Sequence, residues 1–208
     1  MSYAVKEIFL TLQGEGMQAG RRAVFLRFAG CNLWSGREAD RAEAACRFCD
    51  TDFVGTDGEN GGRYAAEALA ARVEALWGEG SGRLVVVTGG EPALQLDEAL
   101  VGALHARGFE VAVESNGTIR APDGIDWLCI SPKGGTEVVQ RRGDELKLVW
   151  PQAGIDPEAL LGWDFRHFLL QPMDGPEREA ALAASIAYVM EHPAWKLSLQ
   201  THKLIGLP

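Results

Sequence analysis

The chain has 208 residues, carries a formal net charge of −9 and is 47% hydrophobic, which suits one domain with a full core. It has no apolar run of about 18 residues, as a membrane-spanning helix would need, and its N-terminus lacks a signal-peptide pattern, so we expect a cytoplasmic protein. The acidic balance and the lack of a basic stripe argue against direct binding of nucleic acid.

Eight apolar, β-branched-rich segments predict strands. In chain order they are Val5–Leu12, Ala23–Phe28, Leu84–Thr88, Glu110–Glu114, Trp127–Ile130, Glu145–Val149, His167–Gln171 and Lys196–Leu199. Helical patterns lie between some of them, at Tyr64–Trp77, Leu94–Arg107 and Glu177–Glu191. This alternation predicts a parallel sheet. The connections after Glu114 and Ile130 are too short for a full helix, so we expect an α/β partial (β/α) barrel forming a single domain, residues 1–208.

Six of the predicted strands run into short polar motifs. They are AGC after Phe28, TGGEP after Val87, ESNG at 114–117, SPK after Ile130, QPMD after Leu170 and QTHK after Leu199. Any one of them could be turn chemistry alone, since Gly, Pro, Ser and Asn are common in turns. Six in succession at the same end of their strands predict one site, because the carboxyl ends of barrel strands form one rim.

Three of the four cysteines cluster in the sequence. Cys46 and Cys49 form a CxxC pair, Cys31 precedes them by a gap of fourteen residues, and Cys129 stands alone in an apolar run, as a small buried residue would. A structural zinc ion is one interpretation, but zinc usually takes four protein ligands and no fourth is near. Three thiolates on a [4Fe–4S] cluster would leave one iron open for another ligand.

The long gap between the first two cysteines is compatible with a cluster. Lengthening a loop from three to fourteen residues costs about 1.4 kcal/mol of closure entropy, whereas forming a metal site can contribute on the order of 10 kcal/mol. The inserted segment Glu38–Ala45 is rich in helix formers, so we expect it to be ordered. In the expected fold, the insert after Cys31 forms a lid.

The cysteines, with an aromatic residue before the last, and Gly89-Gly90-Glu91-Pro92 resemble the radical S-adenosylmethionine superfamily. A longer set of motifs resembles one family in it, the 7-carboxy-7-deazaguanine synthases, over nearly the whole chain. The set comprises TLQGEG at 11–16, FLRFAGCNLW at 25–34, CDT at 49–51 and the TGGEP, ESNG, SPK, QPMD and QTHK motifs.

The resemblance implies a radical lyase that converts 6-carboxy-5,6,7,8-tetrahydropterin to 7-carboxy-7-deazaguanine with loss of ammonia, for the biosynthesis of queuosine and other 7-deazapurines. It implies a [4Fe–4S] cluster on Cys31, Cys46 and Cys49, S-adenosylmethionine that is regenerated after each turnover, and Mg²⁺ at Thr51. The expected partners are the small pterin substrate, an electron donor such as a flavodoxin or ferredoxin, and a second copy of the chain in a homodimer.

The resemblance also implies two sets of binding residues. The substrate set is Leu12, Gln13, Gly14, Glu15, Arg27, Thr88, Glu114, His202 and Pro208. The S-adenosylmethionine set is Phe48, Cys49, Asp50, Gly90, Ser131, Pro132, Lys133, Gln171, Pro172, Met173 and Asp174.

Some of these residues also have an interpretation that involves no ligand. Arg27 suits a carboxylate ligand but could form a surface ion pair, Asp50-Thr51 could cap a helix, and His202 could be a surface histidine. The tail Leu204–Pro208 is apolar, so we expect it to pack, with its terminal carboxylate at the substrate.

Two other functions fit part of the sequence. A radical activase that places a glycyl radical on a partner enzyme would share the cysteines and GGEP, but should lack the TLQGEG and Arg27 set. A non-catalytic zinc-binding module would need only the cysteines.

Overall fold

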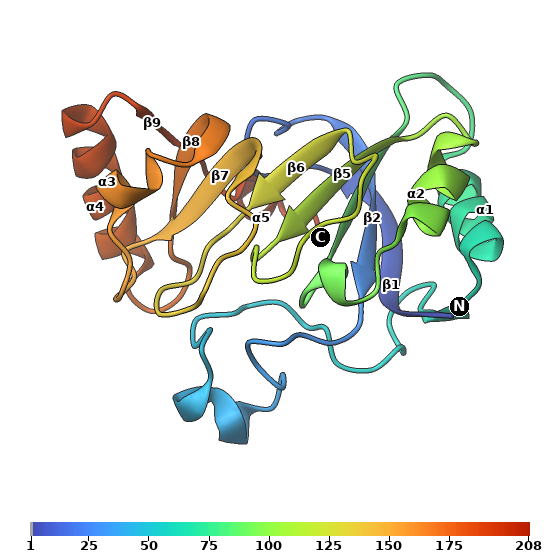
Figure 1. Ribbon diagram of the computed structural model, residues 1–208, viewed down its shortest axis with the longest axis horizontal. Coiled ribbons are helices and arrows are strands. Elements are labelled where there is room, and N and C mark those ends of the chain that lie inside the picture. Colours follow the sequence, from blue (N-terminus) through green and yellow to red (C-terminus); the bar gives the residue numbers. More distant parts are fainter. Residues whose placement is uncertain (1) are drawn as a thin grey trace.

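Nine strands form one sheet in the computed structural model, which describes residues 2–208 (Figure 1). The sheet order is β3-β1-β2-β4-β5-β6-β7-β8-β9. The strands are β1 Tyr3–Leu12, β2 Arg22–Phe28, β3 Gly62–Tyr64, β4 Leu84–Gly89, β5 Glu110–Ser115, β6 Trp127–Ile130, β7 Arg142–Trp150, β8 Asp164–Pro172 and β9 Trp195–Leu197. Within these residues, no helix has the length and apolar character needed to cross a membrane.

The sheet is parallel from β2 through β9 in its spatial order, and β1 and β3 add to it in antiparallel fashion. β1 pairs with β2 in antiparallel fashion because the segment that joins them is short and has no helix, and such a connection suits a hairpin. Over residues 2–208 the sheet stays open, with β3 and β9 at its edges. The expected partial barrel is therefore confirmed.

Helices lie at both ends of the sheet, and one short helix lies behind its middle (Figure 1). The helices are α1 Ala66–Trp77, α2 Glu98–His105, α3 Pro157–Leu160, α4 Arg178–Glu191 and α5 Thr201–Ile205, with 3₁₀ turns η1 Glu38–Glu43 and η2 Pro92–Leu94. α1 and α2 pack against β1, β2, β4 and β5 in the larger core, and α4 packs against β8 and β9. No helix follows β5 or β6 before the next strand, as the short connections predicted.

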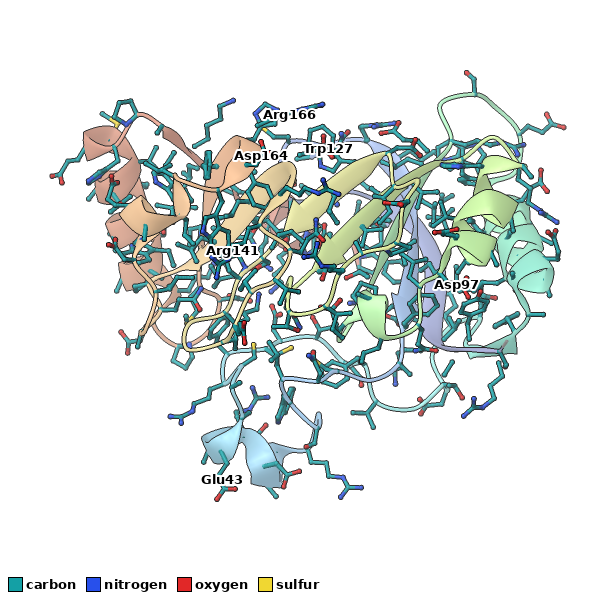
Figure 2. The ribbon with its side chains drawn as sticks, in the orientation of Figure 1. Glu43, Asp97, Trp127, Arg141, Asp164 and Arg166 are labelled. Atoms are coloured by element: carbon teal, nitrogen blue, oxygen red, sulfur yellow. The ribbon has the colours of Figure 1, made fainter. Side chains whose placement is uncertain are left out.

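Two predicted helices start too early. Tyr64 belongs to β3, a three-residue strand paired with the start of β1, which is too short to show an alternating pattern. α2 begins at Glu98 because the side chain of Asp97 accepts a hydrogen bond from the Leu100 amide at 3.0 Å and caps the helix (Figure 2). Asp97 is a typical N-cap residue, but apolar residues also precede it, so the helical pattern extends back to Leu94 and places the start of the helix too early.

Candidate active site

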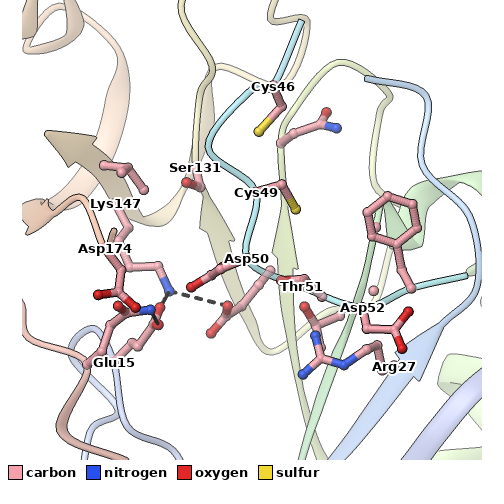
Figure 3. A pocket seen from close by; sticks show the side chains of 18 of the residues that line it. Glu15, Arg27, Cys46, Cys49, Asp50, Thr51, Asp52, Ser131, Lys147 and Asp174 are labelled. Atoms are coloured by element: carbon pink, nitrogen blue, oxygen red, sulfur yellow. Dashed lines mark hydrogen bonds and ion pairs between the residues drawn. The ribbon is translucent and has the colours of Figure 1, made fainter. Parts of the chain in front are cut away.

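One pocket of about 350 Å³ lies at the carboxyl ends of the strands and collects residues from all six motifs (Figure 3). Most of the residues expected at the site line it. They are Leu12, Gln13, Glu15, Arg27, Cys31, Cys46, Phe48, Cys49, Asp50, Thr51, Thr88, Gly90, Glu114, Ser131, Lys133, Gln171, Pro172, Asp174, His202 and Pro208. The barrel rim thus brings together segments that are nearly 200 residues apart in sequence.

Three expected binding residues lie outside the lining. Gly14 supports α5, since its carbonyl accepts hydrogen bonds from the amide and hydroxyl of Thr201 at 2.9 and 2.8 Å. The carbonyl of Pro132 accepts a bond from the Gln152 side chain at 3.3 Å, and the amide of Met173 donates to the backbone of β7. Each holds the rim in shape through its backbone.

The three clustered cysteines lie at one side of this pocket, and all are free thiols. The Cys46 and Cys49 side chains of the CxxC pair are hydrogen-bonded to each other, and this bond lowers the pKa of Cys49 to about 6. Burial raises the pKa of Cys31, against hydrogen bonds from the backbone amides that follow it. Within residues 2–208, no three His, Cys, Asp or Glu side chains come close enough to hold a single metal ion. Three thiols at one side of a pocket suit an iron–sulfur cluster, which takes one thiolate per iron and would keep a fourth iron open.

The insert between Cys31 and Cys46 only partly forms the expected lid. Leu33 and Trp34 line the pocket, but η1 has no buried residue and projects away from the sheet, with Glu43 near its tip (Figures 1 and 2). Arg41 ties the insert to the cysteine loop: its guanidinium stacks 4.1 Å over the Trp34 ring and donates to the carbonyls of Arg47 and Cys49 at 2.9 and 3.0 Å. The insert therefore braces the CxxC loop from outside.

The GGEP motif joins the first cysteine to the neighbouring strand end. A side chain at Gly90 would collide with Gly30 and the Cβ of Cys31, so glycine is required for this close approach. Glu91 is fully buried, and its carboxylate accepts hydrogen bonds from the Ser115 hydroxyl and the Asn116 amide, both at 2.8 Å. These bonds join the carboxyl ends of β4 and β5 next to the pocket.

The opposite side of the pocket is a polar floor centred on Lys147. Its ammonium lies 2.5 Å from Glu15 and 3.2 Å from Glu114, and all three residues line the cavity (Figure 3). Burial alone would raise the pKa of Glu15, but the charge of Lys147 and hydrogen bonds from Lys147, Gln200 and Gln171 outweigh it and lower the pKa to about 2. Sequence reasoning missed Lys147, although a lysine alternating with leucines on a strand was the available signal.

Arg27 forms an ion pair, as its alternative interpretation predicted, but within the pocket lining and not on the surface. Its Nε lies 2.7 Å from a carboxylate oxygen of Glu7 on the adjacent strand, and both side chains are mostly buried. Only Nε has a protein partner within the described residues. The terminal Nη groups are left for an anionic ligand.

The residues around Thr51 bear on the expected Mg²⁺ site. Asp50 pairs with Lys203 at 2.6 Å, and Asp52 pairs with Lys6 at 2.9 Å. No helix starts at Asp50 or Thr51, so the helix-cap interpretation is wrong. Asp50, Thr51 and Asp52 all line the cavity, and because each carboxylate is paired with a lysine, the Thr51 hydroxyl is the uncharged side-chain oxygen that this loop offers.

The C-terminal helix α5 closes one side of the pocket. Lys203 bridges Asp50 and Asp174 at 2.6 Å each, and the Thr11 hydroxyl donates to the backbone oxygen of Pro208 at 3.2 Å. The expectation of a packed apolar tail is wrong for its side chains, since Leu204 is 59% exposed. Instead, His202 and Lys203 of α5 line the pocket, and of the tail residues 204–208 only Pro208 does so.

Gly14→Ala is expected to displace α5. The added methyl group would collide with the ring of His202, so the helix must shift at a cost of ~1–3 kcal/mol. The unfolding temperature should fall by several degrees and the KM for substrate should rise. Gly102→Ala within α2 is the matched control: nothing lies within 4 Å of its added carbon, so it should leave KM unchanged and slightly stabilise the helix. Equal KM values for Gly14→Ala and wild type would contradict this role.

Known proteins resemble the chain along its whole length. Residues 41–144 match the Radical SAM superfamily. A 7-carboxy-7-deazaguanine synthase of Caulobacter vibrioides is 66% identical, and one of Bordetella pertussis 64% identical, each with full coverage of both chains. The crystal structure of QueE from Escherichia coli superimposes with a TM-score of 0.75 at 28% identity, over 97% of this chain and 95% of that one. The chain belongs to the 7-carboxy-7-deazaguanine synthase family of the radical SAM superfamily.

Proposed function

We propose that the protein converts 6-carboxy-5,6,7,8-tetrahydropterin to 7-carboxy-7-deazaguanine with release of ammonia. The observation that carries this proposal is a single pocket with three cysteines on one side and a charged, hydrogen-bonding floor on the other. Substrate and product differ by one ammonia, so the reaction needs no net oxidant. Membership of the family supports the same reaction.

The cysteine side fits an iron–sulfur cluster and S-adenosylmethionine. Cys31, Cys46 and Cys49 would hold the cluster, and three thiolates leave one iron for the amino and carboxylate groups of S-adenosylmethionine. When bound, this pair supplies the radical that removes a hydrogen atom from the substrate. Residues of the SPK and QPMD motifs line the same pocket and would bind the nucleoside part, with Phe48 against the adenine.

The polar floor fits the pterin. The free Nη groups of Arg27 would bind the substrate carboxylate through two parallel bonds. Glu15 and Glu114 would accept hydrogen bonds from the N–H groups of the pyrimidine edge. Thr88 and His202 line the same cavity and would contact the ring, and the terminal carboxylate of Pro208 would accept a further N–H. Residues of the TLQGEG motif and Arg27, which the activase alternative should lack, line this pocket.

Thr51 would be a protein ligand of Mg²⁺. A magnesium ion keeps six oxygen ligands and readily takes several from substrate and water. The lysine pairs of Asp50 and Asp52 balance the charge of both carboxylates, which supports the Thr51 hydroxyl as the ligand that the loop contributes.

Thr51→Ala is expected to weaken the stimulation of turnover by Mg²⁺ and to leave iron content unchanged. The hydroxyl is lost, whereas the cysteines and the lysine pairs of the loop stay in place. Turnover measured against Mg²⁺ concentration checks this, and Thr51→Ser, which keeps the hydroxyl, is the matched control. The same Mg²⁺ response in Thr51→Ala and wild type would exclude Thr51 as a ligand.

The proposal includes the setting in which the enzyme works. We propose one catalytic domain over residues 1–208, a cytoplasmic location, a flavodoxin or ferredoxin as electron donor, and a homodimer. Direct contact with nucleic acid is not part of the proposal, because the chain is acidic and the substrate is a small molecule.

The decisive experiment incubates anaerobically purified protein with a chemical reductant, S-adenosylmethionine and the carboxy-tetrahydropterin. The expected product is lighter than the substrate by one ammonia, and it should not form when S-adenosylmethionine is omitted. Metal analysis of the same sample should find iron and sulfide. Zinc in their place would favour the zinc-module alternative, and unchanged substrate would refute the proposed reaction.

A further inference from the structure

Lys147 is the most deeply buried charge in the pocket. It projects from the middle of β7, and only 3% of its surface is exposed. Its ammonium contacts Glu15, which follows β1, and Glu114, which ends β5. A buried ammonium needs such partners, because desolvation penalises an unpaired charge. The lysine therefore joins three strands that are separated in the sheet.

Amide side chains complete the hydrogen bonding of both carboxylates. Gln200 donates to the second oxygen of Glu15 at 2.9 Å, and Gln13 donates to the second oxygen of Glu114 at 2.8 Å. The Glu15 amide donates in turn to the Gln13 side chain at 3.0 Å. Each carboxylate thus has one oxygen on Lys147 and one on an amide, which sets its orientation before any ligand arrives.

The charges of Lys147, Glu15 and Glu114 do not cancel. Two carboxylates face one ammonium, which leaves one net negative charge at the floor. Burial would lower the pKa of Lys147, but the charges of Glu114 and Glu15 outweigh it and hold the pKa well above its usual range. The other ionisable groups facing Lys147 are Cys129, Glu145 and Lys133.

We propose that Lys147 is a positioning residue that keeps Glu15 and Glu114 charged and separated, so that together they accept hydrogen bonds from an N–H-rich edge of the substrate. The inference rests on the proposed function. Without the ammonium, two carboxylates would face each other in a buried pocket, and one of them would take up a proton. A protonated carboxyl presents a donor where the substrate also presents donors, so binding would become dependent on pH.

Lys147→Met tests this, because methionine removes the charge and keeps most of the length. The KM for the pterin should rise at neutral pH and rise further as the pH falls from about 8 to about 6, since the ionised fraction falls about tenfold for each pH unit below a pKa. Wild type should show no such trend over this range. Iron content and S-adenosylmethionine binding should be unchanged, and kcat should fall less than kcat/KM.

Three further variants separate charge from packing. Lys147→Arg keeps the positive charge and should keep KM independent of pH. Lys147→Met combined with Glu15→Gln and Glu114→Gln leaves no ionisable member of the group, so its KM, although raised, should not depend on pH. Lys196→Met on exposed β9 is the matched surface control and should match wild type.

The outcomes distinguish this inference from the proposed function. If wild type makes no product, the proposed function fails. If wild type is active and Lys147→Met keeps a pH-independent KM, the function stands and the inference is overturned. The same pH trend in Lys147→Arg and Lys147→Met would also overturn it, because the charge would then not be the cause. Should Lys147→Met fail to fold, the arginine and triple variants still test the inference, and a pH trend in either overturns it.

Discussion

Changing any one of Cys31, Cys46 and Cys49 to alanine is expected to remove the cluster and abolish product formation. Reconstituted wild type should hold about four irons per chain and be brown, and each variant should lose both iron and colour. The reason is that the site offers three thiols at one side of a single pocket, with no fourth to replace a missing ligand. Iron and sulfide analysis with the visible absorption spectrum measures this effect.

Cys129→Ala is the matched control for these variants. Cys129 is 2% exposed in β6 and does not line the pocket, and burial raises the pKa of its thiol well above the usual range. A buried neutral thiol of this kind is a packing residue. The variant should therefore retain iron, colour and turnover. Loss of the cluster in Cys129→Ala, with retention in Cys31→Ala, would overturn the ligand assignment.

Extending the chain beyond Pro208 is expected to raise KM for the pterin about tenfold or more, which is the usual scale for losing a charged hydrogen-bond partner. Pro208 lines the pocket, and its backbone oxygen accepts a bond from Thr11. An added peptide would replace the carboxylate with a neutral amide and would need space at the pocket edge.

The control for this extension is the same peptide placed before the exposed Ser2, which should leave KM near the wild-type value. Iron content and S-adenosylmethionine binding should be unaffected by either extension, because Pro208 is bonded to Thr11 of β1 and the cysteines belong to a different loop. Equal kinetics for the extended and unextended chains would show that Pro208 does not contact the substrate.

The sequence alone determined the architecture and most of the site. Strand and helix periodicities are local, and a parallel strand places its carboxyl end at a common rim whatever its neighbours, so the six motifs could be brought together without coordinates. The cysteine spacing and the short connections after β5 and β6 are equally local. These features predicted the open barrel and most of the pocket lining.

Only the tertiary structure decided which charges are paired. Lys147 meets Glu15 and Glu114 across 132 and 33 residues of sequence, and Lys203 meets Asp50 across 153. No periodicity encodes such partners, because they depend on which strands become neighbours and on how the C-terminal helix folds back. The same reason explains the insert after Cys31. We expected it to form a lid, but it braces the cysteine loop through Arg41. Composition predicts whether a segment is ordered, but a side chain's role is set by the groups that surround it.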